Sequence, residues 1–201
     1  YFFMKLLAFT DVHDNQSLIN EVIKKANSKK IDFLICLGDL TIFGDNLEKI
    51  LKRFNQLNSK TILVHGNHED FVDMKNVCKK FKNIVYLHEN VYEIDNYIFV
   101  GFGGGWFNRE SPEFERLFNK LEKKVKDKKI ILLTQPPPAK TKIDHMEYFG
   151  HVGNKTIRNF ITKFKPILAA SGHLHENFGK IDRIGKTILI NPGPLGRIIE
   201  V

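Results

Sequence analysis

The sequence predicts an α/β fold built around a largely parallel sheet. Residues 1–82 alternate three apolar runs with three amphipathic helical patterns, an order typical of parallel strands joined by helices. Hydrophobic residues make up 42% of the 201-residue chain and charged residues 27%, the balance of a globular protein. This length favours one domain with a sizeable core.

The amino-terminal part supplies three strand–helix pairs. We expect strands where the apolar runs stand, at 5–11, 31–39 and 60–67. We expect helices where apolar residues recur at helical spacing, at 17–30, 46–57 and 70–81. No apolar run approaches the ~20 residues of a membrane span, so no membrane partner is expected.

The rest of the chain is richer in short strands. Close-set β-rich segments at 83–89, 91–96 and 97–105 predict antiparallel pairing. Further strands are expected at 129–135, 166–175, 179–185, 186–193 and 196–201. Helices are expected at 111–128 and 154–165; in the first, Ser111 can cap the helix and Pro112 suits its first turn.

We expect a single domain covering residues 4–201, since no linker, repeat or low-complexity segment interrupts the chain. Tyr1, Phe2 and Phe3 precede Met4, where we expect the native chain to begin. The two cysteines, 42 residues apart, match neither a disulfide framework nor a zinc site. A reducing, cytoplasmic setting fits this composition.

The net charge of +8 admits two interpretations. Such a field attracts an anionic substrate, or the lysines are simply solvated helix faces. The lysine doublets are scattered and lack the interleaved aromatic residues that mark a nucleic-acid surface, so nucleic acid is not the expected partner.

Polar residues follow five of the expected strands, at the point where each strand ends. They are Asp11, His13, Asp39, Asn67, His68, Gln135, His173 and His175. The carboxyl ends of parallel strands meet at one edge of a sheet, so these side chains are expected to lie together. Each motif on its own is more simply interpreted as an ordinary loop or turn than as a functional site. Their combination of carboxylate, amide and imidazole donors suits divalent Mn, Fe or Zn.

The motifs DVH, GDL, GNHE and GHLH, in that order, resemble those of the calcineurin-like metallophosphoesterases. The resemblance covers nearly the whole chain, and its carboxyl-terminal part is similar to a small subgroup of prokaryotic single-domain members. It implies a four-layer α/β/β/α sandwich of two mixed sheets flanked by helices. It also implies hydrolysis of phosphate mono- or diesters by a metal-activated hydroxide at a dinuclear site.

The resemblance further implies a role for each site residue. A first metal ion would be bound by Asp11, His13 and His175, a second by Asn67 and His173, and Asp39 would bridge the two. His68 would stay uncoordinated and help the leaving group depart. The metals would be Mn, Fe, Zn or Ni, and the substrate a small phosphate ester, with nucleotides among the candidates. A catalytically weakened metal-binding scaffold and a nuclease are the alternative functions.

Gln135 departs from the family pattern, in which many members carry a metal-binding histidine at this position. The amide oxygen of Gln135 can still coordinate the second metal, but it binds a borderline cation less well than imidazole does. Alternatively, Gln135 only hydrogen-bonds the loop backbone. In either case the second site is expected to be weaker than the first.

The other histidines allow fewer conclusions. His145 and His151 lie in the loop before the helix at 154–165, and this loop either lines the substrate pocket or is an ordinary surface loop. His65 is expected to be structural, and no partner is evident for His88. The glycine-rich segment 101–107 lacks the Lys and Ser/Thr of a P-loop, so we expect a tight turn near the rim of the site.

Overall fold

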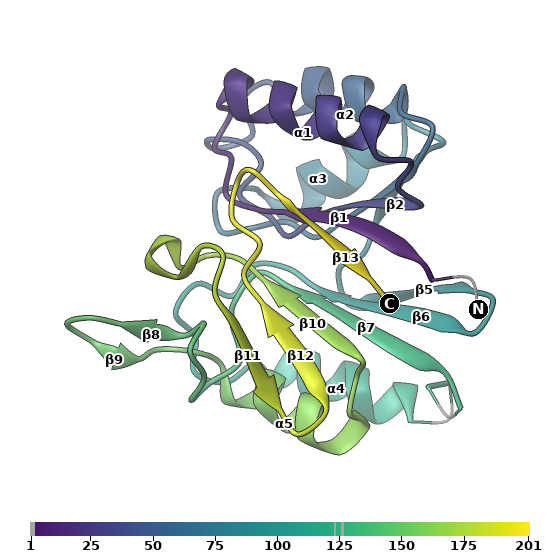
Figure 1. Ribbon diagram of the computed structural model, residues 1–201. Helices are drawn as coiled ribbons and strands as arrows, with labels where there is room; N and C mark the ends of the chain where they lie inside the picture. Colours follow the sequence, from purple (N-terminus) through teal and green to yellow (C-terminus); the bar gives the residue numbers. More distant parts are fainter. Residues whose placement is uncertain (1–2, 123, 126) are drawn as a thin grey trace.

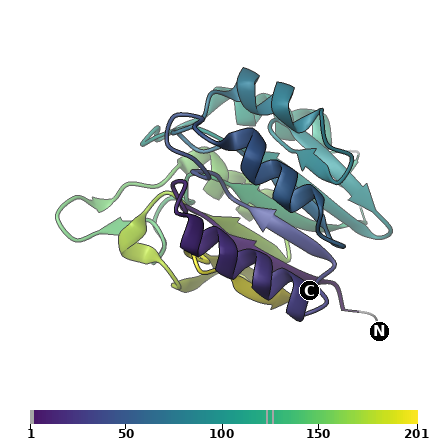
Figure 2. The ribbon, with the colours of Figure 1, turned by 90° about the horizontal axis from the view of Figure 1, so that it is seen from above.

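A computed structural model describes residues 3–122, 124–125 and 127–201; Tyr1 and Phe2, expected to precede the native chain, lie outside the described residues. The first of its two large sheets has the strand order β13-β1-β2-β3-β4. These strands are β1 (Lys5–Phe9), β2 (Phe33–Cys36), β3 (Lys60–Leu63), β4 (Ile84–Tyr86) and β13 (Arg197–Glu200). The helices on its outer face are α1 (Gln16–Ser28), α2 (Leu47–Asn55) and α3 (Phe71–Cys78) (Figure 2).

The second sheet has the order β11-β12-β10-β7-β6-β5. Its strands are β5 (Asn90–Ile94), β6 (Tyr97–Phe102), β7 (Lys129–Thr134), β10 (Leu168–Ser171), β11 (Ile181–Ile184) and β12 (Thr187–Ile190). The helices on its outer face are α4 (Pro112–Leu121) and α5 (Lys155–Phe164) (Figure 1). The two sheets face each other, and the predicted four-layer sandwich is confirmed.

Strand β1 shows why the sheets are buried on both faces. Leu6 and Ala8 pack between the two sheets, together with Phe99 of β6. Leu7 and Phe9 pack on the other face, in the cluster that also contains residues of α1 and α2. Successive side chains of a strand point to opposite faces, so a continuous apolar run serves a strand that has a layer on either side.

Two of the expected elements are wrong in part. Strand β4, expected to pair antiparallel with its successors, instead pairs parallel with β3, because α3 carries the chain across as in the preceding β-α-β units. The expected antiparallel pairing of β5 and β6 is confirmed.

The helix expected at 111–128 ends at Leu121, where the amides of Lys124 and Val125 both bond the Leu121 carbonyl. Residues 123 and 126 of the expected span lie outside the described residues. Ser111 precedes α4, but its side chain makes no capping bond; its Oγ instead accepts a hydrogen bond from Asn154.

The parallel arrangement places the loops after the strands of both sheets along one edge of the sandwich. β1, β2 and β3 run parallel to one another in the first sheet, as β6, β7, β10 and β12 do in the second. The loops after these strands therefore meet, as the sequence predicts. Within the described residues, no helix combines the length and apolarity needed to cross a bilayer.

Candidate metal centre

Asp11 follows β1 and is held by hydrogen bonds from two other residues. Thr10 Oγ1 donates to Asp11 Oδ2 at 2.6 Å, and the His173 amide donates to the same oxygen at 3.0 Å. His175 Nε2 lies 3.6 Å from Asp11 Oδ1 and 3.2 Å from His13 Nε2. Asp11, His13 and His175, the residues expected at the first metal, thus offer ligand atoms within 4.8 Å of one another.

Asp39 follows β2 with a φ of 49°, in the left-handed region that non-glycine residues rarely adopt. Its Oδ1 accepts a hydrogen bond of 3.0 Å from the His68 amide. Asp39, His13 and His68 form a second group whose ligand atoms lie within 4.8 Å of one another. Gly66 passes so close that an added Cβ would lie 1.9 Å from Asp39 Oδ1, so this position needs glycine.

Glu69 is a residue to which the sequence analysis assigned no role. Its buried carboxylate accepts hydrogen bonds from the Gly66 amide at 2.8 Å, the Asp39 amide at 3.1 Å and the Thr41 amide at 2.8 Å. These bonds join the loop after β2 to the loop after β3 and fix the backbone that carries Asp39. The acidic residue that closes GNHE was the available signal.

Four buried polar atoms at this edge lack a hydrogen-bond partner among the described residues. They are Asn67 Oδ1, His68 Nδ1, Gln135 Oε1 and His173 Nε2. Leaving such an atom unpaired costs ~1–3 kcal/mol, and native proteins keep few of them. All four belong to residues that the sequence places at the site, so these atoms are available to bind a ligand there.

The Gln135 side chain is fully buried and faces the other site residues. Its Nε2 lies 3.5 Å from Asp11 Oδ1, and a Cβ added to Gly38 would lie 2.5 Å from its Oε1. Among the described residues, its side chain makes no hydrogen bond to the backbone of its own loop. Gln135 is therefore placed where it can reach a cation.

The electrostatics of the cluster favour a bound cation. Burial, together with the nearby carboxylates of Asp11 and Glu69, raises the pKa of Asp39 to about 8. Burial also opposes ionisation of Asp11, but the nearby His175 imidazole and the hydrogen bonds from Thr10 and the His173 amide outweigh it and hold the Asp11 pKa below its ordinary value. A divalent cation would offset the repulsion between these carboxylates.

Burial lowers the pKa of His13 and of His173, which keeps both imidazoles in the neutral form that binds metals. The donor set of carboxylates, imidazoles and amides suits borderline divalent cations. Together with the unpaired atoms, this chemistry fits the metal ions that the family resemblance implies.

The structure places His145 and His151 outside this cluster. They face each other across a two-stranded ribbon made of β8 (His145–Met146) and β9 (Gly150–His151), and both are exposed. His151 Nδ1 bonds the buried carboxylate of Asp144 at 2.7 Å. Neither histidine joins a metal-ligand group of the described residues, and their role in substrate binding stays a prediction.

His65 and His88 pack together beside β6, with ring centroids 4.5 Å apart. His65 Nδ1 bonds the Tyr86 hydroxyl at 2.8 Å, and burial lowers the pKa of His65 to about 3. His88, for which the sequence showed no partner, accepts a hydrogen bond from the Gly103 amide at 3.1 Å and stacks on Phe102. The partner of His88, which was not evident in the sequence, is therefore the loop after β6.

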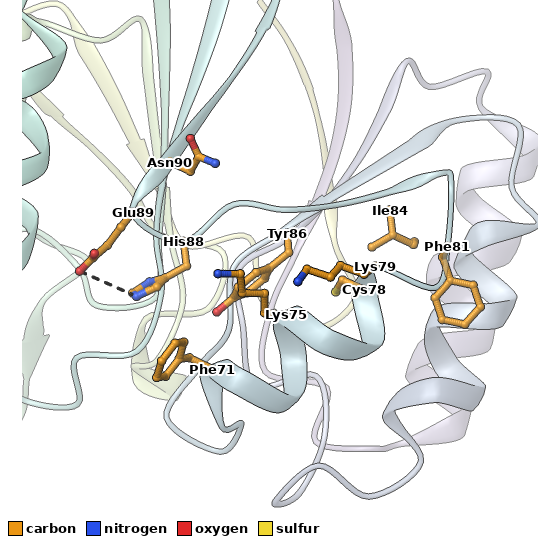
Figure 3. Close-up of a pocket in the computed structure, with 10 residues that line it drawn as sticks. All are labelled: Phe71, Lys75, Cys78, Lys79, Phe81, Ile84, Tyr86, His88, Glu89 and Asn90. Atoms are coloured by element: carbon orange, nitrogen blue, oxygen red, sulfur yellow. Dashed lines mark ion pairs between the residues drawn. The ribbon is translucent and has the colours of Figure 1, made fainter.

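A cavity of 690 Å³ lies beside α3, β4 and the start of β5 (Figure 3). Lys75 of α3 and Lys79, which follows this helix, line one side of it, and Tyr86, His88 and Asn90 line the other. None of its lining residues belongs to the predicted site, so its size does not identify it as the centre of the chemistry.

Known proteins resemble this chain in sequence and in fold. The uncharacterized protein MJ1162 of Methanocaldococcus jannaschii is 32% identical over 204 residues, which cover 96% of this chain and 89% of that protein. A probable glycerophosphodiester phosphodiesterase, GpdQ, of Arcobacter nitrofigilis is 27% identical over 188 residues, covering 85% of this chain and 66% of that protein.

The crystal structure of TT1561 of Thermus thermophilus superposes with a TM-score of 0.78, over 96% of this chain and 91% of that one. Its sequence identity of 16% makes this a likeness of fold alone. The family model of the calcineurin-like phosphoesterases matches residues 4–177. The chain therefore belongs to the calcineurin-like phosphoesterase family, the hydrolases that act on phosphoester bonds.

Proposed function

We propose that the protein hydrolyses small phosphate esters at a centre of two divalent metal ions. The observation that carries this proposal is the set of four unpaired buried atoms, on Asn67, His68, Gln135 and His173. An isolated buried acceptor is a local defect, whereas several at one edge of the sandwich point to bound groups. Asn67, Gln135 and His173 would contact a cation, and His68 would contact the substrate.

Each cation would be bound by its own group of ligands. Asp11, His13 and His175 would hold the first cation, because their ligand atoms already lie within 4.8 Å of one another. Asn67, His173 and Gln135 would hold the second, and Asp39 would contact both. Bound cations of this kind supply an activated water and neutralise charge on the phosphoryl oxygens.

His68 would act on the leaving group. The hydrogen bond between its amide and Asp39 fixes its backbone, and its ring lies 4.8 Å from that of His13 and 5.4 Å from that of Phe43, measured between centroids. Its Nδ1 has no partner among the described residues, so it can hold the proton that the departing oxygen takes up.

Metal removal and return tests this function. The protein is treated with a chelator and assayed on phenyl phosphate, glycerol phosphate and a glycerophosphodiester, the last because a relative is named as a probable glycerophosphodiester phosphodiesterase. Hydrolysis of at least one ester should disappear with the metal and return with Mn²⁺ or Zn²⁺. Metal content is measured on the same samples.

Matched variants locate the activity. Asp39→Asn should lose both bound metals together with activity, while Asp73→Asn, an exposed aspartate on α3, should keep both. Two metals per chain without hydrolysis of any ester would favour the metal-binding scaffold. Full activity in the chelated protein would contradict the metal-dependent mechanism.

A further inference from the structure

We infer that a cavity beside the metal centre binds a flat aromatic group of the phosphate ester, so that the enzyme prefers aromatic esters to glycerol esters. This inference rests on the proposed function, since it concerns the organic part of the same substrate. The cavity has a volume of 340 Å³ and is lined by Phe107, Arg109, Met146, Phe149 and Val152.

Phe107 connects the cavity to the metal centre. Its ring lines the cavity and lies 4.6 Å from the ring of His173, measured between centroids. The amide of His173 bonds Asp11, and its Nε2 is one of the unpaired site atoms. A phosphoryl group held at the centre would therefore have this cavity as a neighbour for its ester substituent.

The lining suits a flat apolar ring. Four of the five side chains are apolar, and the exposed fractions of Phe107 and Phe149 are 52% and 73%. Aromatic rings and the Arg109 guanidinium both stack on aromatic faces, whereas the hydroxyls of glycerol would find one polar side chain here. The volume exceeds the roughly 150 Å³ that accommodates benzene in an engineered apolar cavity.

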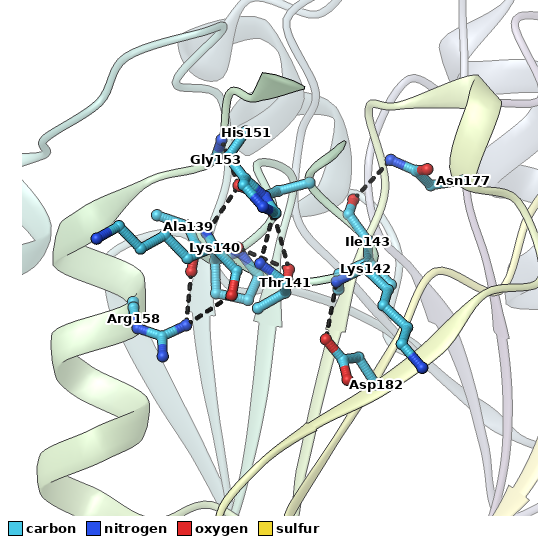
Figure 4. Close-up of polar contacts among 12 residues, drawn as sticks. Ala139, Lys140, Thr141, Lys142, Ile143, His151, Gly153, Arg158, Asn177 and Asp182 are labelled. Carbon is cyan, nitrogen blue, oxygen red and sulfur yellow. Dashed lines mark hydrogen bonds and ion pairs between the residues drawn. The ribbon is translucent and has the colours of Figure 1, made fainter. Parts of the chain in front are cut away.

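One wall of the cavity is a ribbon with a fixed base. The Asp144 carboxylate is fully buried and accepts hydrogen bonds from the amides of Lys140 at 2.9 Å, Thr141 at 2.6 Å and Gly153 at 3.0 Å. Figure 4 shows Lys140, Thr141, His151 and Gly153 gathered at the ribbon's base, beside the contacts of Lys142 with Asp182 and of Ile143 with Asn177. A fixed base presents Met146, Phe149 and Val152 in a preformed arrangement, which lowers the entropic cost of binding.

The other wall is the loop after β6, and Arg109 joins it to the ribbon. Arg109 Nη1 donates to the His151 carbonyl, and the Arg109 carbonyl accepts from the Lys155 amide at 2.7 Å. Asn154 Nδ2 donates to the neighbouring Asn108 carbonyl at 2.8 Å. The guanidinium is therefore held in place at the cavity, where its face can stack on a ring.

Substrate preference tests the inference. The Mn²⁺-loaded protein is assayed on phenyl phosphate, a nucleoside monophosphate and glycerol phosphate. At least one aromatic ester should have a kcat/KM about tenfold above that of glycerol phosphate, and Phe149→Ala should reduce that ratio about tenfold, as loss of one stacking contact does. The ester whose ratio falls in Phe149→Ala shows whether the cavity binds a simple aryl group or a nucleobase.

Tyr148→Ala is the matched control, because Tyr148 neighbours Phe149, is 84% exposed and does not line the cavity. It should keep the ratio of the wild-type protein. Equal kcat/KM values for aromatic and glycerol esters, or a ratio that Phe149→Ala leaves unchanged, would overturn the inference while the proposed function stands.

A binding measurement separates the two proposals if no ester is hydrolysed. Trp106 is the single tryptophan of the chain, adjoins Phe107 and is 58% exposed, so its fluorescence reports on the cavity. Phenylphosphonate should change this fluorescence at about tenfold lower concentration than methylphosphonate, and Phe149→Ala should remove the difference. Equal responses to both phosphonates would overturn the inference independently of turnover.

Discussion

At the scale of single residues, His68 adjoins Asn67 in the chain, yet the two are proposed to do different work. Asn67 would offer its amide oxygen to a cation, whereas His68 would face the substrate. The ligand atoms of His68, His13 and Asp39 lie close enough together to bind one metal ion. Geometry alone therefore does not show whether His68 binds a metal ion or acts on the substrate.

Replacing His68 by alanine separates them. His68→Ala should reduce kcat by about 10²–10⁴-fold, the usual contribution of a proton-transferring side chain, while the metal content stays near that of the wild-type protein. Metal analysis and turnover are measured on the same preparation. Loss of a metal ion from His68→Ala would show that His68 is a ligand instead.

We propose that Gln135 sets how tightly the second cation is bound. Gln135→His should strengthen the weaker of two metal-binding events, because imidazole binds Zn, Fe or Mn-like cations better than an amide oxygen does. Titration calorimetry of the wild-type and variant proteins measures this. A weaker event that does not change would mean that Gln135 does not face the metals and that its burial is structural.

At the scale of elements, Asn154 begins α5 and also fixes the loop that carries Phe107 and Arg109. Its side chain accepts a hydrogen bond from the Ile157 amide at 3.0 Å and donates to the Asn108 carbonyl and Ser111 Oγ, both at 2.8 Å. One fully buried amide thus caps a helix and positions a wall of the cavity.

Asn154→Ala should therefore reduce the stability of the fold more than the loss of an ordinary helix cap does. We expect the free energy of unfolding to fall by about 2–4 kcal/mol, from the lost cap and the unpaired groups left buried. Asn15→Ala, which removes the exposed cap of α1, should cost about 1 kcal/mol. Urea denaturation measures both, and equal losses would contradict the double role of Asn154.

At the scale of the whole molecule, the site opposes the stability of the metal-free fold. The pKa of Asp39 is about 8 in the folded protein, above its ordinary value of 3.8. A raised pKa means that folding favours the protonated carboxyl group. The contribution of Asp39 to the free energy of unfolding is therefore fully present below pH 3.8 and is lost as the pH rises through 8. A bound cation would reverse this loss, because it stabilises the ionised carboxylate.

We expect the chelated wild-type protein to lose stability relative to Asp39→Asn between about pH 6.5 and 8, by at most about 1.4 kcal/mol per pH unit. The comparison stays above pH 6.5, the ordinary pKa of histidine, because His65, whose folded pKa is about 3, lowers the stability of both proteins as the pH falls below 6.5. Urea denaturation in chelator at several pH values measures the difference. A difference independent of pH would contradict the raised pKa of Asp39.

Much of the arrangement was predictable from particular residues. Asp11, Asp39 and Gln135 each follow a buried strand, and parallel pairing brings strand ends to one edge. The incorrect and the missing expectations concerned contacts that the local pattern does not contain. The helix after Pro112 ends at Leu121, Ser111 bonds Asn154 instead of its own helix, and His88 finds a partner in the loop after β6.

By itself, the sequence determined the order of strands and helices, the strand ends and the residue types that gather there, because hydrophobic pattern and chain order are local properties. The four layers were implied by the family resemblance of the motifs. Tertiary structure alone decided which atoms meet. Glu69 reaches the Asp39 amide across 30 positions of the chain, and His13 reaches His175 across 162. The first contact joins loops of neighbouring strands in one sheet, and the second joins loops of the two sheets. Such contacts, like the burial that raises the Asp39 pKa, arise only when the chain has folded and these loops share one edge.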